Sequence, residues 1–209
     1  EIASCLVGSE MCIRDSQLIA AGAISICATG LLGACSEKKA EFRGVDVTGA
    51  EYARDIPLTD HNGQPRHIKD FAGKVVVVFF GYTQCPDVCP TSMQELAEVK
   101  QMLGKDAGRL QGIFVTVDPD RDTPEVLKAY MANFDPSFLA LYGTPEQLAA
   151  VAKDFKIYYK KVDGKTPTSY TMDHSAGSYV YDPSGLSLIH ISELSLIHIS
   201  EPTRQEAIS

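Results

Sequence analysis

Two cysteines, Cys85 and Cys89, are separated by three residues in the segment FFGYTQCPDVCP, between an apolar run and a helical pattern. A junction from a strand to a helix directs free backbone N–H groups and the positive end of the helix dipole at nearby side chains. This position is expected to lower the pKa of a thiol, and the thiolate is the form that binds metals or attacks disulfides. The pattern therefore predicts a metal-binding or redox-active pair.

The spacing of the two cysteines favours metal binding over a simple disulfide. Helical positions four apart place their Cβ atoms about 5–6 Å from each other, whereas a disulfide prefers about 3.5–4.5 Å. Two sulfurs that each lie about 2.3 Å from one ion can span the larger gap. We therefore expect a metal clip that can also oxidise after local adjustment; the alternative is an inert disulfide or two buried thiols.

The donor chemistry narrows the choice of metal. Two soft thiolates suit Cu(I), zinc or an iron–sulfur cluster. A cluster normally requires four cysteines, and structural zinc requires four protein ligands. Copper accepts two thiolates and one imidazole, so copper fits the available residues best.

The imidazole would come from one of three histidines, and the residue pattern alone does not decide between them. His61 lies in an Asn-Gly turn and is expected to be solvated, while His67 is expected at the surface of a short polar strand. His174 follows Asp173, which could orient its ring, but an isolated histidine is more often structural. Met172 is a possible soft ligand, although packing is its expected role.

Composition restricts the class of protein. The chain has 209 residues, 44% of them hydrophobic and 22% charged, which indicates one globular domain with appendages. Its net charge of −8 argues against nucleic acid as a partner, because phosphate binding requires a basic surface.

Both ends of the chain carry unusual sequence. The octapeptide LSLIHISE occupies 186–193 and again 194–201, and it includes His190 and His198. This repeat and the segment CLVGSEMCIRDS (5–16) resemble translated sequencing-adapter read-through. We therefore expect 1–16 and 186–209 to be non-native; the alternative is that the repeat forms a pair of alternating β-strands.

An apolar segment predicts a membrane attachment. Residues 17–34 are mostly small and apolar, as in the core of a signal peptide, and they lead into LGAC, which ends at Cys35 and resembles a bacterial lipobox. We expect 17–35 to be a lipoprotein signal peptide with Cys35 as the lipidation site; the alternative is an uncleaved membrane anchor. Either places the domain at the periplasmic or extracytoplasmic face of a bacterial membrane. The cysteines outside these segments are then Cys85 and Cys89.

The remaining chain predicts an α/β sandwich over 56–185, after an extension at 36–55. A hairpin is expected at 56–68 around the Asn-Gly turn, and the apolar run 74–80 reads as a buried central strand. Capping residues and early prolines predict the later helices. The expected helices are 91–103, 123–134 and 144–155, and the expected strands are 112–117, 138–142, 156–162 and 178–182, with a loop over 164–177.

Three motifs together resemble the Sco/SenC family: FFGYTQCPDVCP at 79–90, VDPDRDT at 117–123 and MDHS at 172–175. Members of this family are thioredoxin-fold copper chaperones for the dinuclear copper site of cytochrome c oxidase. The resemblance, over roughly 50–185, implies a thioredoxin-like sandwich with an N-terminal β-hairpin extension. It also implies that Cys85, Cys89 and His174 bind copper as Cu(I), with Cu(II) as a second state, and that the copper-bearing oxidase subunit is the partner.

Two points qualify this resemblance. The acidic loop at 118–123 needs no role beyond a turn and a helix cap. The family continues past the position of Gly185 with a strand and a helix, which the repeat replaces here, so a layer over the sheet is expected to be missing.

Two main functions remain open at this point, and a third, a peroxidase with Cys85 as the reactive residue, is weaker. The first is a metallochaperone, which is not an enzyme. The second is a thiol–disulfide reductase in which Cys85 and Cys89 reduce the copper-site cysteines of the oxidase and His174 is dispensable.

Overall fold

The structure is a computed structural model that describes residues 45–47, 49–166 and 169–191. The predicted segments 1–16 and 17–35, with the lipidation site Cys35, lie outside the described residues, as do 36–44 and 192–209. The expected segment boundaries therefore stay predictions.

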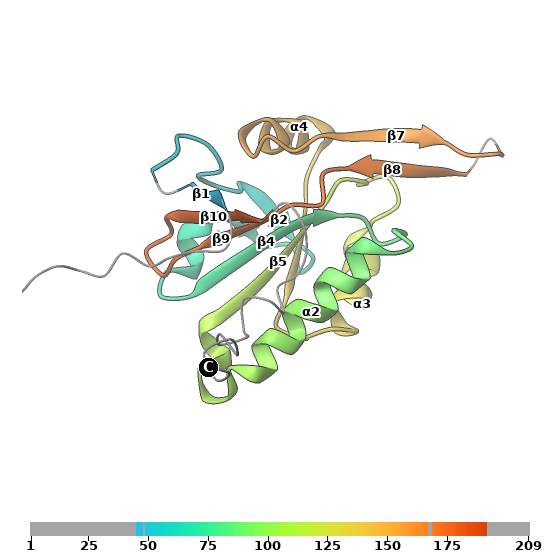
Figure 1. Cartoon of the computed structure of the whole chain (residues 1–209). Helices are drawn as coiled ribbons and strands as arrows, with labels where there is room; N and C mark the ends of the chain where they lie inside the picture. The colour runs from blue at the N-terminus through green and yellow to red at the C-terminus, as the bar shows by residue number, and fades with distance from the viewer. Residues whose placement is uncertain (1–44, 48, 167–168, 192–209) are drawn as a thin grey trace, which may run out of the picture. The chain divides into compact units, whose positions relative to one another are not determined.

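The strand that leads to the cysteines lies at the centre of an eight-stranded sheet (Figure 1). This strand is β4 (Val75–Gly81), which pairs in parallel with β5 (Leu110–Thr116) and antiparallel with β9 (Ser178–Tyr181). The strand order is β1-β10-β9-β4-β5-β6-β2-β3. The outer strands are β6 (Leu139–Tyr142), β2 (Leu58–Asp60), β3 (Pro65–Arg66), β10 (Ser187–Ile191) and β1 (Val45–Asp46).

The two later helices begin where the caps predict them, whereas the first begins at Val88, three residues before the expected residue 91. The helices are α2 (Val88–Met102), α3 (Pro124–Ala132) and α4 (Pro145–Asp154), with 3-10 turns at Ile68–Phe71 and Gly104–Arg109. The hydroxyl oxygens of Thr123 and Thr144 accept hydrogen bonds from the backbone N–H groups of Val126 and Gln147. These bonds satisfy N–H groups that the first helical turn leaves unpaired.

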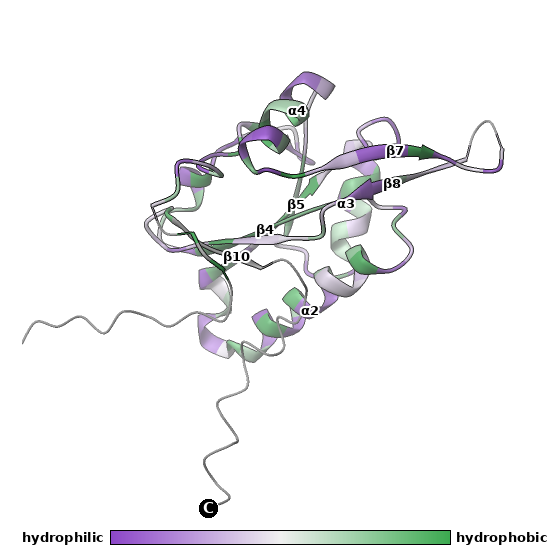
Figure 2. Ribbon diagram, turned by 45° about the horizontal axis from the view of Figure 1, so that its top comes forward, coloured by the Kyte–Doolittle hydropathy of each residue, from purple (hydrophilic) through white to green (hydrophobic). Residues whose placement is uncertain are grey.

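Both faces of β4 are covered, as its unbroken apolar sequence predicts. On one face Phe79 packs near Phe114, whose ring lies 5.5 Å from that of Tyr130 on α3. On the other face Phe80 lies 5.1 Å from Phe155, which follows α4. Figure 2 shows α2 and α4 on opposite sides of the strand. The predicted thioredoxin-like α/β sandwich is confirmed.

The predicted N-terminal hairpin is also confirmed, since β2 and β3 pair antiparallel. The Asp60 carboxylate stabilises the turn by accepting from the N–H groups of Asn62 and Gln64 and from Nε of Arg66. Burial acts to raise the pKa of this carboxyl, but these three hydrogen bonds outweigh it and hold the pKa below the ordinary 3.8.

Replacing Asp60 with asparagine is therefore expected to lower the free energy of unfolding by about 2 kcal/mol at pH 7, because a charged acceptor is lost. A depressed folded-state pKa contributes stability above the unfolded-state pKa, and this contribution is lost as the pH falls. The difference between the two proteins should thus shrink below about pH 3.8. Urea unfolding of the two proteins at several pH values measures the difference in their free energy of unfolding. A difference that does not change with pH would contradict the stabilising role of the Asp60 charge.

One predicted loop is wrong. The expected loop over 164–177 contains the strand β8 (Tyr170–His174), which pairs with β7 (Tyr159–Asp163) in a separate two-stranded sheet. The hairpin extends beyond the central sheet (Figure 1). Four of the five β7 residues are exposed and β8 buries only Met172. Strand β7 therefore lacks the apolar alternation by which a half-buried strand is recognised, whereas β8 alternates in burial but over five residues only.

The sheet also continues past the expected boundary at residue 185. Strand β10 pairs with β9 and with β1, after a turn in which Gly185 has a positive φ of 83°. The first copy of the repeat therefore supplies a strand of the sheet, whereas the expectation of a missing layer over the sheet stays a prediction. The origin of 186–209 stays a prediction.

Candidate metal centre

The two cysteines come from different local structures. Cys85 lies in the loop between β4 and α2, where its backbone N–H donates to the Tyr82 carbonyl at 3.2 Å. Cys89 is the second residue of α2 and is fully buried, whereas Cys85 is half-buried. Both are free thiols. The spacing argument, which placed both residues on one helix, is therefore wrong in its geometry, although the loop still brings the sulfurs together.

His174 completes the group. It is the last residue of β8, and its Nε2 lies 3.6 Å from the Sγ of Cys89. One ligand atom from each of Cys85, Cys89 and His174 lies within 4.8 Å of the others. Within the described ranges, no other group of three such side chains is arranged to hold a metal ion.

The imidazole presents the correct nitrogen to the thiols. Its Nδ1 lies 3.0 Å from the Ser175 carbonyl, which can only accept, so Nδ1 carries the proton and Nε2 presents a lone pair. The prediction that Asp173 orients the ring is wrong: Asp173 is exposed, and the backbone of Ser175 provides the contact. The buried Tyr82 ring also meets the imidazole edge to face, with centroids 5.8 Å apart.

The other candidate ligands have different roles. His61 is not simply solvated as expected, because its Nδ1 accepts from the Ala140 backbone N–H at 3.1 Å. Burial lowers the pKa of His61. Nδ1 of His67 lies 2.6 Å from a carboxylate oxygen of Asp55. Met172 is buried in the core, as expected.

Gly81, at the end of β4, creates the space that Cys89 occupies. A Cβ at this position would lie 2.7 Å from the Sγ of Cys89 and 2.9 Å from Cε2 of Phe114. Carbon atoms do not tolerate such approaches without a shift of the neighbours. Sequence reasoning missed this role, although a glycine at the end of a buried strand is itself a signal of close approach.

The predicted lowering of the thiol pKa is wrong for Cys89 in the metal-free protein. Burial raises the pKa of the Cys89 thiol, and the adjacent Cys85 thiol raises it further. A hydrogen bond with the Tyr82 backbone acts to lower this pKa, but burial outweighs it. A bound cation would supply the missing positive charge and displace the proton, as metal binding to thiols generally does.

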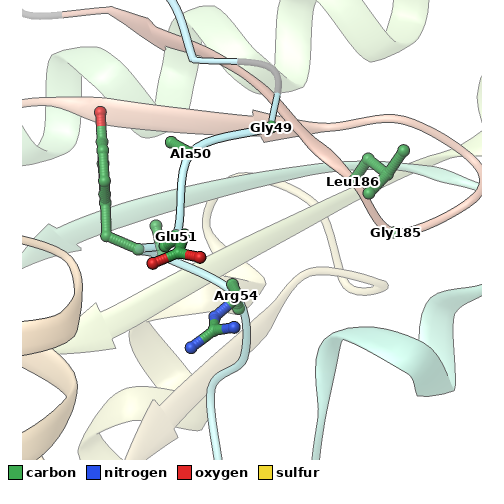
Figure 3. A pocket seen from close by; sticks show the side chains of 8 residues that line it. Gly49, Ala50, Glu51, Arg54, Gly185 and Leu186 are labelled. Carbon is green, nitrogen blue, oxygen red and sulfur yellow. The ribbon is translucent and has the colours of Figure 1, made fainter.

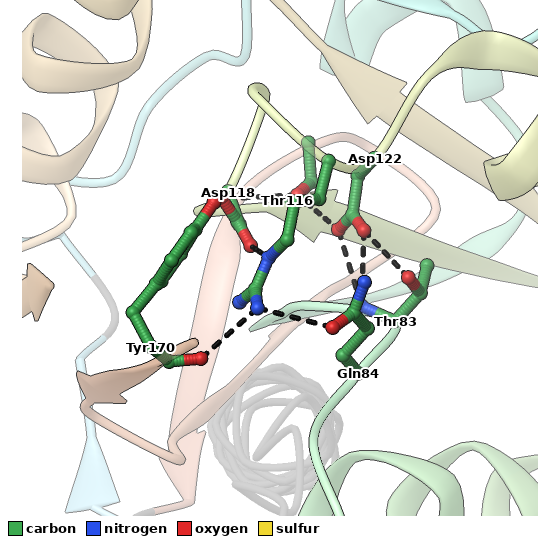
Figure 4. A network of polar contacts seen from close by, with 7 residues as sticks. Thr83, Gln84, Thr116, Asp118, Asp122 and Tyr170 are labelled. Carbon is green, nitrogen blue, oxygen red and sulfur yellow. Dashed lines mark hydrogen bonds and ion pairs between the residues drawn. The ribbon is translucent and has the colours of Figure 1, made fainter. Parts of the chain in front are cut away.

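The acidic loop does more than turn the chain and cap α3. The carboxylate of Asp122 is buried and accepts from the backbone N–H of Thr83 at 3.1 Å, and from the hydroxyls of Thr83 and Thr116 at 2.5 Å each (Figure 4). Burial raises the pKa of Asp122, while these hydrogen bonds oppose the shift. Asp122 therefore fixes the loop two residues before Cys85.

A separate pocket takes no part in this group. It has a volume of about 410 Å³ and lies between segment 49–54 and the turn at Gly185 and Leu186 (Figure 3). Its lining contains one acid and one base, Glu51 and Arg54, and none of the three candidate ligands. No cluster of donors or nucleophiles in it indicates a chemical role.

Comparison with known proteins identifies relatives across this domain. The family model described as SCO1/SenC matches residues 46–199, a range that includes the metal-ligand group and β10. An SCO2-like protein of Rickettsia felis is 38% identical over 137 residues, which are 65% of this chain and 67% of that protein. The mitochondrial SCO2 homolog of Bos taurus is 38% identical over 134 residues, which span half of that protein.

Solved structures resemble the chain in fold as well. The structure of Bradyrhizobium japonicum ScoI with copper bound is 45% identical, with a TM-score of 0.61, and the match covers 65% of this chain and 86% of that one. Yeast Sco1 with copper bound is 30% identical, also with a TM-score of 0.61, over 74% and 93% of the two chains.

The part of the chain that the structure describes contains no helix with both the length and the apolar character to cross a bilayer.

Proposed function

Since the chain belongs to the SCO1/SenC family, we propose that it binds one copper ion through Cys85, Cys89 and His174 and delivers it to the copper-bearing subunit of cytochrome c oxidase. One observation carries this proposal: three donors from segments 85 residues apart in sequence converge within 4.8 Å.

The donor set suits Cu(I). Two thiolates and a neutral imidazole are soft or borderline ligands, and a three-coordinate site of this kind fits Cu(I) better than zinc or a cluster. Cu(II) would add a fourth ligand. The copper-bound relatives, which share 45% and 30% identity with this chain, support the assignment.

The cellular setting follows from the same proposal. Segment 17–35, by lipidation at Cys35 or as an anchor helix, would tether the domain of 56–185 and the adjoining β10 to the extracytoplasmic face of a bacterial membrane. There the domain would meet the oxidase subunit that requires copper, and copper would pass between the two proteins through shared thiolates.

The thiol–disulfide reductase alternative is not favoured. A reductase would need the cysteine pair but no imidazole ligand. Here the His174 imidazole presents a free lone pair to Cys89, a donor that a reductase would not need.

Copper stoichiometry tests the proposal directly. The full chain, with the four cysteines outside the domain replaced by serine (Cys5, Cys12, Cys27 and Cys35), is loaded anaerobically with excess Cu(I), desalted and analysed for metal and protein. We expect about one copper ion per chain. The matched control, which also carries Cys85→Ser and Cys89→Ser, should retain almost none. Equal copper content in the two proteins would reject the site.

A further inference from the structure

Arg121 connects three segments that are distant in the sequence. From the loop between β5 and α3, its Nε donates to the Asp118 carboxylate at 2.5 Å. Its Nη1 donates to Oε1 of Gln84 and to the backbone carbonyl of Tyr170, both at 3.0 Å (Figure 4). The planar guanidinium holds several acceptors in a fixed geometry, which a lysine could not do.

The contacted segments are those that carry the candidate ligands. Gln84 directly precedes Cys85 in the chain. Tyr170 begins β8, and His174 ends it. Because a strand is an extended and stiff unit with a rise of about 3.4 Å per residue, fixing Tyr170 constrains the position of His174 at the other end.

The Tyr170 side chain reinforces this contact. Its ring lies 3.6 Å from Cζ of Arg121, in cation–π geometry, and its hydroxyl donates to the other Asp118 oxygen at 2.8 Å. Asp118 is only 3% exposed, so its charge is compensated by these two partners in a site of low dielectric. Arg121, Asp118 and Tyr170 thus form a closed polar triangle.

Few side chains of the β7–β8 hairpin are buried, although Tyr159 and Tyr170 are partly buried against the core. Of its described residues, Met172 alone is buried, and Val162 is 43% exposed. Hydrophobic burial, the usual source of tertiary stability, is therefore small here, and polar contacts must contribute a large share.

We propose that Arg121 is a positioning residue for the metal centre: it clamps the β7–β8 hairpin to the cysteine loop and so holds His174 against the thiols. This inference rests on the proposed function, because the first of its two tests measures copper affinity. Arg121 does not itself bind the ion.

A double-mutant cycle tests whether Arg121 affects copper affinity through His174. Competition with a Cu(I) chelator should show that Arg121→Met weakens Cu(I) binding about 10-fold, as loss of an outer positioning contact does. Tyr170→Phe, which removes only the hydroxyl, should weaken it less. In a His174→Ala background, Arg121→Met should have almost no further effect, because the ligand that it positions is absent. A further loss of the same size would show that Arg121 acts elsewhere and would overturn the proposal.

A second readout requires no metal. In the metal-free protein, the edge-to-face contact of Tyr82 with His174 should give ring-to-ring nuclear Overhauser effects. Arg121→Met should abolish or strongly weaken them while the rest of the spectrum stays folded. Retention of these signals at wild-type intensity would contradict the clamp.

Arg66→Met provides the matched control. Arg66 also pairs with a buried aspartate, Asp60, but on the β2–β3 hairpin. This variant should change stability without changing copper affinity or the Tyr82–His174 signals. If the wild-type chain binds no copper, the proposed function fails, and the metal-free signals still decide the clamp. If it binds copper and Arg121→Met binds equally well, the clamp fails alone.

Discussion

Replacing His174 with alanine is expected to lower the Cu(I) affinity on the order of 100-fold or more. Loss of a residue that only contacts a ligand commonly lowers metal affinity about 10–100-fold, and loss of the ligand itself should have at least as large an effect. The imidazole is one of three donors, and Nε2 already faces Cys89 in the metal-free protein. His174 is only half-buried, so the free energy of unfolding should change by less than about 0.5 kcal/mol. Chelator competition and urea unfolding of the same samples measure the two quantities.

This variant also separates the two candidate functions. A copper carrier without His174 should fail to support oxidase assembly in cells, as should Cys85→Ser. A reductase would need the cysteine pair alone, so His174→Ala would then sustain assembly while Cys85→Ser would not. His67→Ala is the matched control, because its ring pairs with Asp55 and lies outside the ligand group.

Replacing Gly81 with alanine is expected to lower the free energy of unfolding by about 1–3 kcal/mol, the usual effect of overpacking a core. The added methyl group would meet the Cys89 sulfur at 2.7 Å and two aromatic rings, those of Phe114 and Phe79, at 2.9 and 3.0 Å. Relief of this overlap would displace the sulfur, so Cu(I) affinity should fall as well. Urea unfolding and chelator competition test both effects.

Gly108→Ala makes the same chemical change where there is room for it. A Cβ at Gly108 meets nothing within 4 Å, and Gly108 is not among the residues with positive φ. This variant should be neutral or slightly stabilising, because alanine reduces the entropy of the unfolded chain. Equal effects of the two substitutions would show that packing around Cys89 is not tight.

Local sequence signals predicted the framework of the site. The apolar run of β4, the Thr-Pro starts of α3 and α4 and the Asn-Gly hairpin each carry a strong short-range preference, and all were confirmed. Three motifs were sufficient to predict the family, which the matching family model confirms. The individual ligand roles of Cys85, Cys89 and His174 stay predictions, to which the structure adds their proximity.

Tertiary contacts account for what the sequence did not predict. Four of the five residues of β7 are exposed, so its sequence carries no apolar alternation, and the short strand β8 buries Met172 alone. The contacts of Arg121 and Asp122 join loops 37 and 39 residues apart, and no local pattern records such pairs. The raised pKa of Cys89 likewise depends on burial in the folded chain, which a strand-to-helix motif does not specify.

If the chain passes copper to a partner as proposed, the unequal burial of the two sulfurs would give this transfer a direction. An incoming ligand from an acceptor protein could approach the ion on the side of Cys85, which is half-exposed, but not through the interior around Cys89. The outer thiolate would then be exchanged first and the inner one last. Release would proceed stepwise, so the acceptor would already bind the ion when the last bond to this chain breaks.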